Sequence, residues 1–175
     1  MIIIKKADEE EIRILSKKLL SLLEDKNSRL YQDNITKFGI PDEYVKRAFS
    51  ENTLLKATKT GKSTFYLALE DKEIVGFAQI IQQDAKTIEL DRIIVFFPRK
   101  GIGTQLLKEI IQDQKQKGVN NIIVTTGKEE NHARQFYEKN GFKQVDKRII
   151  DTPWGNKLTI VIYKLNLENQ NHSPQ

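Results

Sequence analysis

Cysteine is absent from the 175-residue chain, and there are only two histidines, His132 and His172. Without cysteine the protein has no disulfides, no thiolate-ligated metal centre and no thiol nucleophile. Two histidines give a metal site little support, so no metal is expected. The first apolar run, Ile2–Ile4, is far shorter than the roughly 7–15 residues of a signal-peptide core, and no run approaches the roughly 18 residues of a membrane span. We therefore expect a soluble, cytoplasmic protein with no membrane partner.

Charge of one sign is not concentrated anywhere along the chain. Lys and Arg number 29 against 24 Asp and Glu, which gives a net charge of +5. These charges are interleaved, whereas arms that bind nucleic acid carry blocks of five or six like charges. A dispersed excess suits a small anionic ligand, and no nucleic-acid partner is expected. A basic nucleic-acid-binding protein would show binding that falls steeply with salt.

The length predicts a single domain, which we place at residues 1–166, followed by a polar, disordered tail at 167–175. Asp8 and Glu11 form a capping-box pattern before a helix that reaches Glu24. The stretch 25–61 is less regular, with one helix beginning near Pro41. Strands are predicted by apolar and β-branched runs at 1–6, 64–69, 74–81, 87–97, 119–126, 142–150 and 158–165.

Two further helices interrupt the second half of the chain. One begins at Ile102 and ends at Gly118, a glycine in the position that commonly follows a helix. The other is capped by Asn131 and stops at Asn140-Gly141. The strand at 119–126 is almost continuously apolar, which predicts burial on both faces. The order of elements indicates an α/β fold with a mixed, mostly antiparallel seven-stranded sheet and helices on both faces.

The segment that follows the strand at 87–97 combines cations with glycines. Arg99 and Lys100 precede Gly101 and Gly103 at the start of a helix, where free backbone N–H groups favour an anion. The alternative is a tight strand-to-helix turn that needs glycine only for its backbone. The fingerprints of dinucleotide-binding and P-loop folds are both incomplete, because Leu106 replaces the third glycine of the first and Lys56 the first glycine of the second.

The sequence resembles the GCN5-related N-acetyltransferase (GNAT) superfamily at two places. Lys100-Gly101-Ile102-Gly103 after a strand is similar to motif A of that family. The segment 131–142, Asn-His-Ala-Arg-Gln-Phe-Tyr-Glu-Lys-Asn-Gly-Phe, is similar to motif B. Glu89-Leu90-Asp91-Arg92-Ile93 also resembles the spermine/spermidine acetyltransferase (PaiA) branch.

This resemblance implies transfer of an acetyl group from acetyl-CoA, as cosubstrate, to a primary amine. Pantetheine would insert where the fourth and fifth strands splay apart, and backbone groups would hold it. Pro98 stands where the family has Gln or Arg, and its loop is shorter, so Arg99 would take over an anchoring role. The residues that the resemblance assigns to the cofactor are Ile94, Val95, Arg99, Lys100, Gly101, Ile102, Gly103, Thr104, Asn131 and Tyr137.

The chemistry requires a base, because an alkylammonium with a pKa of about 10.4 cannot attack a thioester. Glu89, acting through a water, is the candidate general base. Asp91 on the same strand face is its rival, and the two together could also attract a cationic acceptor. Tyr137 is the candidate acid that meets the departing thiolate. Its alternative is a core tyrosine of an amphipathic helix.

The acceptor stays open among polyamines, small amines and protein amines. Its determinants are expected in residues 25–61 and in the turn at 151–156, which holds Trp154. A homodimer is a further expectation, in which Trp154 would contact the second copy. The competing hypothesis is a non-enzymatic acyl-CoA-binding or interaction module on the same fold, which would not need Glu89 or Tyr137.

Overall fold

The computed structural model describes residues 1–97 and 101–168. Pro98, Arg99 and Lys100 therefore lie outside the described residues, as does the tail from 169. The chain divides into two compact units, which are described in turn. Unit 1 comprises residues 1–79 and 92–108, and unit 2 comprises residues 80–91 together with the chain from 109 onward.

Seven strands form one sheet in the order β1-β2-β3-β4-β5-β7-β6. The pairs β1–β2, β5–β7 and β6–β7 are antiparallel, while β4 and β5 run parallel. The prediction of a mixed, mostly antiparallel seven-stranded sheet is confirmed. The strands are β1 (Ile2–Lys6), β2 (Ser63–Glu70), β3 (Glu73–Gln82), β4 (Thr87–Val95), β5 (Asn121–Gly127), β6 (Lys143–Asp151) and β7 (Lys157–Asn166).

The first helix of unit 1, α1 (Glu9–Glu24), begins as predicted. The side chain of Asp8 accepts from the backbone N–H of Glu11 at 2.8 Å, and the side chain of Glu11 accepts from the backbone N–H of Asp8 at 3.1 Å. This reciprocal pair satisfies two backbone donors that the start of a helix leaves without partners.

The stretch 25–61 is more helical than the sequence indicated. It holds α2 (Arg29–Tyr31), a wide π-helical turn η1 (Gln32–Thr36), α3 (Asp42–Ala48) and α4 (Glu51–Lys59). We did not predict α4, whose side chains are mostly polar and bury Leu54 alone. The signal for it was Ser50, whose hydroxyl caps the helix by accepting from the N–H of Thr53.

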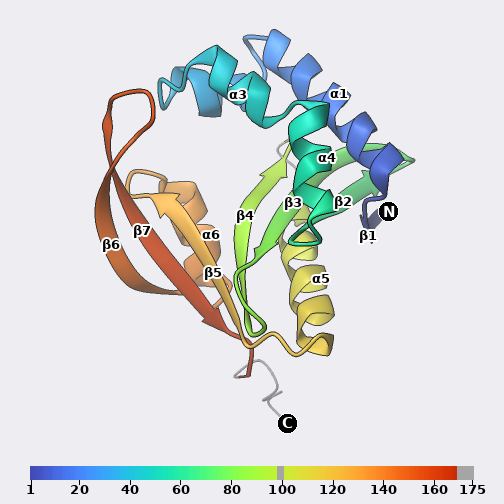
Figure 1. Cartoon of the computed structure of the whole chain (residues 1–175), viewed down its shortest axis with the longest axis vertical. Coiled ribbons are helices and arrows are strands. Elements are labelled where there is room, and N and C mark those ends of the chain that lie inside the picture. Colours follow the sequence, from blue (N-terminus) through green and yellow to red (C-terminus); the bar gives the residue numbers. More distant parts are fainter. Residues whose placement is uncertain (98–100, 169–175) are drawn as a thin grey trace. The chain divides into compact units, whose positions relative to one another are not determined.

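The core of unit 1 lies between these helices and β2, β3 and β4. Figure 1 shows α1 and α4 side by side. The hydroxyl of Ser16 in α1 donates to the backbone oxygen of Phe49 at 2.7 Å and so ties α1 to the segment between α3 and α4. The buried apolar side chains of this core include Leu15, Leu19, Leu54, Phe65, Phe77 and Phe96. Ile94 of β4 packs against this core.

Helix α5 (Ile102–Gln116) is followed two residues later by Gly118. Its φ of +82° confirms its predicted place after the helix. In unit 2, α6 (Asn131–Lys139) lies against β5 and β7 (Figure 1). The prediction that Asn131 caps α6 is wrong. Glu130 holds that position with no side-chain hydrogen bond, and its backbone oxygen accepts from the N–H of Arg134 at 2.9 Å, so Asn131 is the first residue of the helix.

Three other expectations need correction at the level of single residues. Strand β4 ends at Val95, two residues earlier than predicted. Strand β5 alternates, with Ile122 and Val124 buried and Thr125 exposed, so full cover of both faces is wrong. Leu167, assigned to the tail, is 1% exposed and donates its N–H to the oxygen of Asn120 at 2.7 Å, so the packed chain extends past 166. The single domain over 1–166 stays a prediction.

Candidate active site

Within unit 1, Gly76 on β3 faces two consecutive residues of β4. A Cβ placed on Gly76 would stand 2.9 Å from the oxygen of Ile94 and 3.3 Å from the Cα of Val95. The first amide after β4, that of Phe96, donates to the oxygen of Val75 at 2.9 Å. The backbone of β4 therefore passes close to Gly76, an approach that a glycine inside a strand permits. Ile94 and Val95, the residues expected to offer backbone hydrogen bonds, lie at this approach.

The same glycine admits the first residue of α5. The Cγ2 atom of Ile102 would lie 3.5 Å from a Cβ on Gly76, and Ile102 is 2% exposed. The oxygen of Gly101 accepts from the N–H of Gln105 at 2.9 Å, so Gly101 precedes the helix and its φ of +95° requires glycine. The amides of residues 102–104 thus form the first turn, where the helix itself supplies no acceptor.

Four of the six residues expected to cradle the phosphates, 101–104, can be placed. Gly101 is exposed, and Gly103 and Thr104 are partly exposed, at the N-terminus of α5. The helix dipole favours an anion at this end. Arg99 and Lys100, the two cations expected there, lie outside the described residues.

In unit 2, Glu89 is partly buried on β4, at the end of the parallel ladder with β5. Among the described residues that ladder covers Thr87–Glu89 opposite Asn121–Ile123. The Oε2 atom of Glu89 accepts from the Nε2 of Gln83 at 2.9 Å. Burial raises the pKa of Glu89, and the negative charge of Asp91 raises it further. A carboxylate with a raised pKa is a stronger base, as a general base near neutral pH requires.

Asp91, the rival base, is exposed to solvent on the same strand, whereas Glu89 is half-buried. The two carboxylates are close enough for the charge of Asp91 to act on Glu89. The structure therefore brings the expected acidic pair together. Since burial acts on Glu89, the environment distinguishes the two members of the pair.

Tyr137 lies in α6 inside an aromatic cluster and is 6% exposed. Its ring centroid lies 5.5 Å from that of Phe136, 5.4 Å from that of Phe142 and 6.2 Å from that of Tyr163. Burial, and secondarily the charge of Glu130, raises the pKa of Tyr137. The phenol therefore keeps its proton over the physiological range and can act as a hydrogen-bond donor.

Asn131 and Tyr137 share α6 but not a face. Six residues correspond to about 240° around the axis at 100° per residue, and Asn131 is exposed whereas Tyr137 is buried. His132, to which we assigned no role, is also exposed. The pantetheine contact expected of Asn131 stays a prediction.

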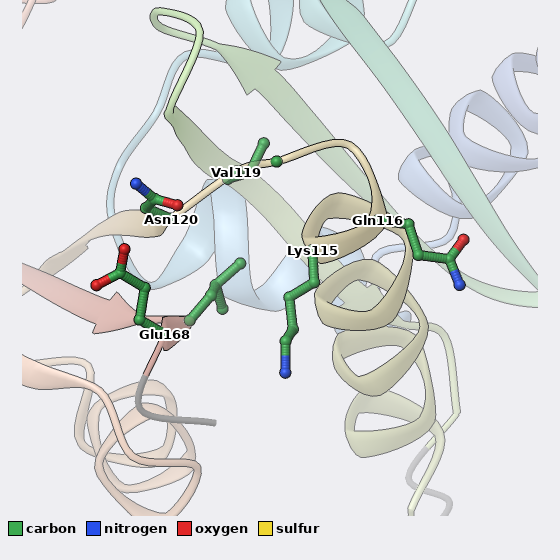
Figure 2. Close-up of a pocket in the computed structure, with 7 residues that line it drawn as sticks. Lys115, Gln116, Val119, Asn120 and Glu168 are labelled. Carbon is green, nitrogen blue, oxygen red and sulfur yellow. The ribbon is translucent and has the colours of Figure 1, made fainter. Parts of the chain in front are cut away.

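A shallow pocket of about 270 Å³ lies elsewhere in unit 2, at the end of α5. Figure 2 shows Lys115 and Gln116 of α5, Val119 and Asn120 before β5, and Glu168 after β7 around it. None of the expected site residues lines this pocket. In the described ranges, no group of three or more His, Asp or Glu side chains is placed to hold a metal ion, and no helix there is long and apolar enough to cross a membrane.

Two residues that bear on the site escaped the sequence analysis. Gly76 stands alone inside a strand pattern, which is a signal for a bulge or a close backbone approach. Gln83 belongs to a polar hairpin connector and carries no sequence signal of its own. Its contact with Glu89 depends on the pairing of the two strands.

Residues 24–142 match the Acetyltransferase (GNAT) family. Among curated proteins, the [ribosomal protein bS18]-alanine N-acetyltransferase of Haemophilus influenzae is 33% identical over 98 residues, 54% of this chain and 66% of that one. The chain matches between 46% and 66% of the length of the curated relatives.

Solved structures share the fold over nearly the whole chain. The PaiA N-acetyltransferase of Thermoplasma acidophilum, in complex with coenzyme A, has a TM-score of 0.65 at 20% identity and covers 91% of this chain and 98% of its own. A GNAT family acetyltransferase from Elizabethkingia anophelis, with acetyl-CoA bound, has a TM-score of 0.59 at 20% identity and covers 94% and 97%.

The family match extends over well more than half of the 175 residues and includes the start of α5 and the whole of α6. The chain belongs to the GNAT acetyltransferase family. The membership expected from the two motifs is thereby confirmed, and PaiA is one of many structural neighbours within the fold.

Proposed function

We propose that the protein is an acetyl-CoA-dependent N-acetyltransferase that moves an acetyl group to a primary amine by direct attack. The observation that carries the proposal is Glu89, a half-buried carboxylate with a raised pKa at the last paired position of β4 and β5. Family membership supplies the cosubstrate class.

In unit 1, backbone groups would hold the cofactor. The first-turn amides of Ile102, Gly103 and Thr104 bind the diphosphate, helped by the helix dipole. Gly101 precedes these amides, and apart from its chain neighbours no atom of the described residues lies within 4 Å of where its Cβ would be, which leaves room for the diphosphate. Ile94 and Val95, next to Gly76, offer backbone hydrogen bonds to pantetheine, and an amide near Val95 stabilises the oxyanion.

In unit 2, two side chains would carry the proton chemistry. Glu89 takes a proton from the substrate ammonium through a water, and the freed nitrogen lone pair attacks the thioester carbonyl carbon. Collapse of the tetrahedral intermediate breaks the carbon–sulfur bond and releases the thiolate of CoA. Tyr137 keeps its own proton and stabilises this thiolate by a hydrogen bond. The second proton of the attacking nitrogen passes to the thiolate sulfur, which leaves the neutral amide carrying the acetyl group and the free thiol of CoA.

The acceptor class is a cationic primary amine, since Glu89 and Asp91 present negative charge to it. The curated relative named above acts on an alanine of a ribosomal protein, and PaiA is an N-acetyltransferase. A protein α-amine and a polyamine are thus the first acceptors to compare. Cytoplasmic location and a homodimer stay predictions.

Calorimetric titration with acetyl-CoA tests the cofactor half, with ATP as the control ligand. We expect saturable binding with a Kd in the micromolar range and no binding of ATP. Amines are then screened for release of the CoA thiol. Absence of acetyl-CoA binding would refute the proposal, and binding without turnover of any amine would favour the acyl-CoA-binding module.

A further inference from the structure

The connection between β3 and β4 is a tight hairpin that fixes the position of Gln83. The N–H groups of Gln83 and Asp84 both donate to the oxygen of Thr87, at 3.0 and 3.3 Å. The carboxylate of Asp84 accepts from the N–H of Lys86 at 2.8 Å and closes the turn. Gln83 therefore pairs directly opposite Thr87.

The hairpin is also anchored to the beginning of β5. The oxygen of Lys86 accepts from the N–H groups of Asn120 and Asn121 at 2.8 and 3.1 Å. The ammonium of Lys86 reaches the oxygen of Gly118 at 3.5 Å. This anchoring leaves the backbone of Gln83 little freedom.

From this position the side chain of Gln83 lies diagonally across from Glu89. Residues opposite each other in an antiparallel pair share a face with residues two positions further on, within reach of a long side chain. The Nε2 atom of Gln83 donates to Oε2 of Glu89 at 2.9 Å. One carboxylate oxygen is thus engaged. In the part of the chain that the structure describes, Oε1 makes no hydrogen bond and can accept a proton.

We propose that Gln83 is a positioning residue for Glu89, which orients the carboxylate and favours its charged form. The proposal rests on the proposed function, in which Glu89 is the general base. A hydrogen bond donated to a carboxylate stabilises the ionised state. Gln83 therefore counteracts the effect of burial and of Asp91, which both disfavour the charged form of Glu89. It keeps Glu89 ionised at the pH where Glu89 must take a proton.

The charged surroundings of Glu89 are simple in the part of the chain that the structure describes. Asp91 is the ionisable group that acts on Glu89 from its own strand. On β5, the paired position holds Ile123, which carries no charge. On the hairpin, the contact is the neutral amide of Gln83. The effect of removing that amide can therefore be measured against one neighbouring charge.

The test compares Gln83→Leu with Gln82→Leu. Gln82 is the adjacent residue of β3, and its amide makes a long contact to the oxygen of Asp84 at 3.4 Å and none to Glu89. We expect Gln83→Leu to move the acidic limb of the kcat/KM profile up by roughly one pH unit, about a tenfold loss on that limb. The Kd for acetyl-CoA and the profile of Gln82→Leu should not change.

A second readout needs no turnover. Carboxyl carbon NMR follows the titration of Glu89 directly, with Glu89→Gln to assign the signal, and Gln83→Leu should raise its midpoint. An unchanged midpoint with intact turnover would overturn the role of Gln83 alone. Loss of kcat at every pH without a shifted profile would also overturn it, because that is the effect of structural damage. If the native protein turns over no amine, the proposed function fails and the role fails with it, even where the NMR midpoint moves.

Discussion

The rings of Tyr137 and Tyr163 lie 6.2 Å apart, and among the described residues the hydroxyl of Tyr163, but not that of Tyr137, is hydrogen-bonded to protein side chains. That hydroxyl donates to Glu138 at 2.7 Å and accepts from the Nε of Arg134 at 3.0 Å. Both partners belong to α6, the helix that carries Tyr137. Tyr163 thus fixes the helix, and Tyr137 is the phenol of the pair available to a ligand.

Replacement of Tyr137 by phenylalanine separates these roles. The ring stays in its aromatic cluster, so we expect little change in stability or in acetyl-CoA affinity. Loss of the donor to the thiolate should lower kcat by about 10- to 100-fold, as for a group that acts in the transition state. Steady-state thiol release and calorimetry measure the two quantities.

The matched control is Tyr163→Phe. It removes hydrogen bonds to two charged side chains and should cost roughly 1–3 kcal/mol of unfolding free energy, seen as a lower Tm. Turnover at a temperature where the variant is folded should fall much less than in Tyr137→Phe. Unchanged turnover in Tyr137→Phe would leave that residue a structural role only.

The pH dependence of the reaction should report Glu89. A base works in its ionised form, so kcat/KM should rise with pH through the pKa of Glu89, which burial and Asp91 raise above its ordinary value. Removing one negative charge in Asp91→Asn lowers that pKa, so the limb should move to lower pH. A pH series at fixed ionic strength measures the shift.

Glu89→Gln should lose most activity near neutral pH and recover part of it as the pH rises, because the free amine then forms without a base. If instead the profile of Glu89→Gln matches the native one, the base is Asp91 or another group. Retention of the limb in Glu89→Gln together with its loss in Asp91→Asn would identify Asp91.

The close approach of the β4 backbone to β3 depends on a glycine in β3. Gly76→Ala would place a Cβ 2.9 Å from the backbone oxygen of Ile94, which cannot move as a flexible side chain does. We expect a loss of roughly 1–3 kcal/mol of unfolding free energy and a weaker Kd for acetyl-CoA. Gly127→Ala in β5 is the control, since its Cβ would meet only a side-chain carbon of Glu130, at 3.4 Å. If both variants change the Kd for acetyl-CoA equally, the close approach at Gly76 has no specific role in cofactor binding.

Gly101, in the turn before α5, can be compared with Gly39, which lies between η1 and α3. Gly101 and Gly39 have φ of +95° and +61°, and each has open space where a Cβ would go. Alanine should therefore cost each roughly 1 kcal/mol of backbone strain, measured by denaturation. Only Gly101→Ala should weaken acetyl-CoA binding, because it distorts the first turn of α5. A normal Kd in Gly101→Ala would remove this turn from the phosphate site.

Local rules in the sequence determined the elements whose causes lie within a few residues. The capping box of Asp8 and Glu11 and the glycine after α5 need no distant partner. The two motifs around α5 and α6 also gave the family, because each is one short stretch with a fixed backbone shape. Helix α4 was missed because few of its residues are apolar, and its burial depends on its packing against α1.

Tertiary structure alone decided which groups act on one another. In the sequence, Glu89 and Asp91 are two carboxylates on the same strand face. It is burial in the folded chain that singles out Glu89, because burial is the larger cause of its raised pKa. Tyr163 engages α6 across 25 positions of sequence, and Gln83 reaches Glu89 because a hairpin folds one strand onto the other. Desolvation and hydrogen bonding depend on distances in space, and spacing along a chain does not fix these distances until the sheet has formed.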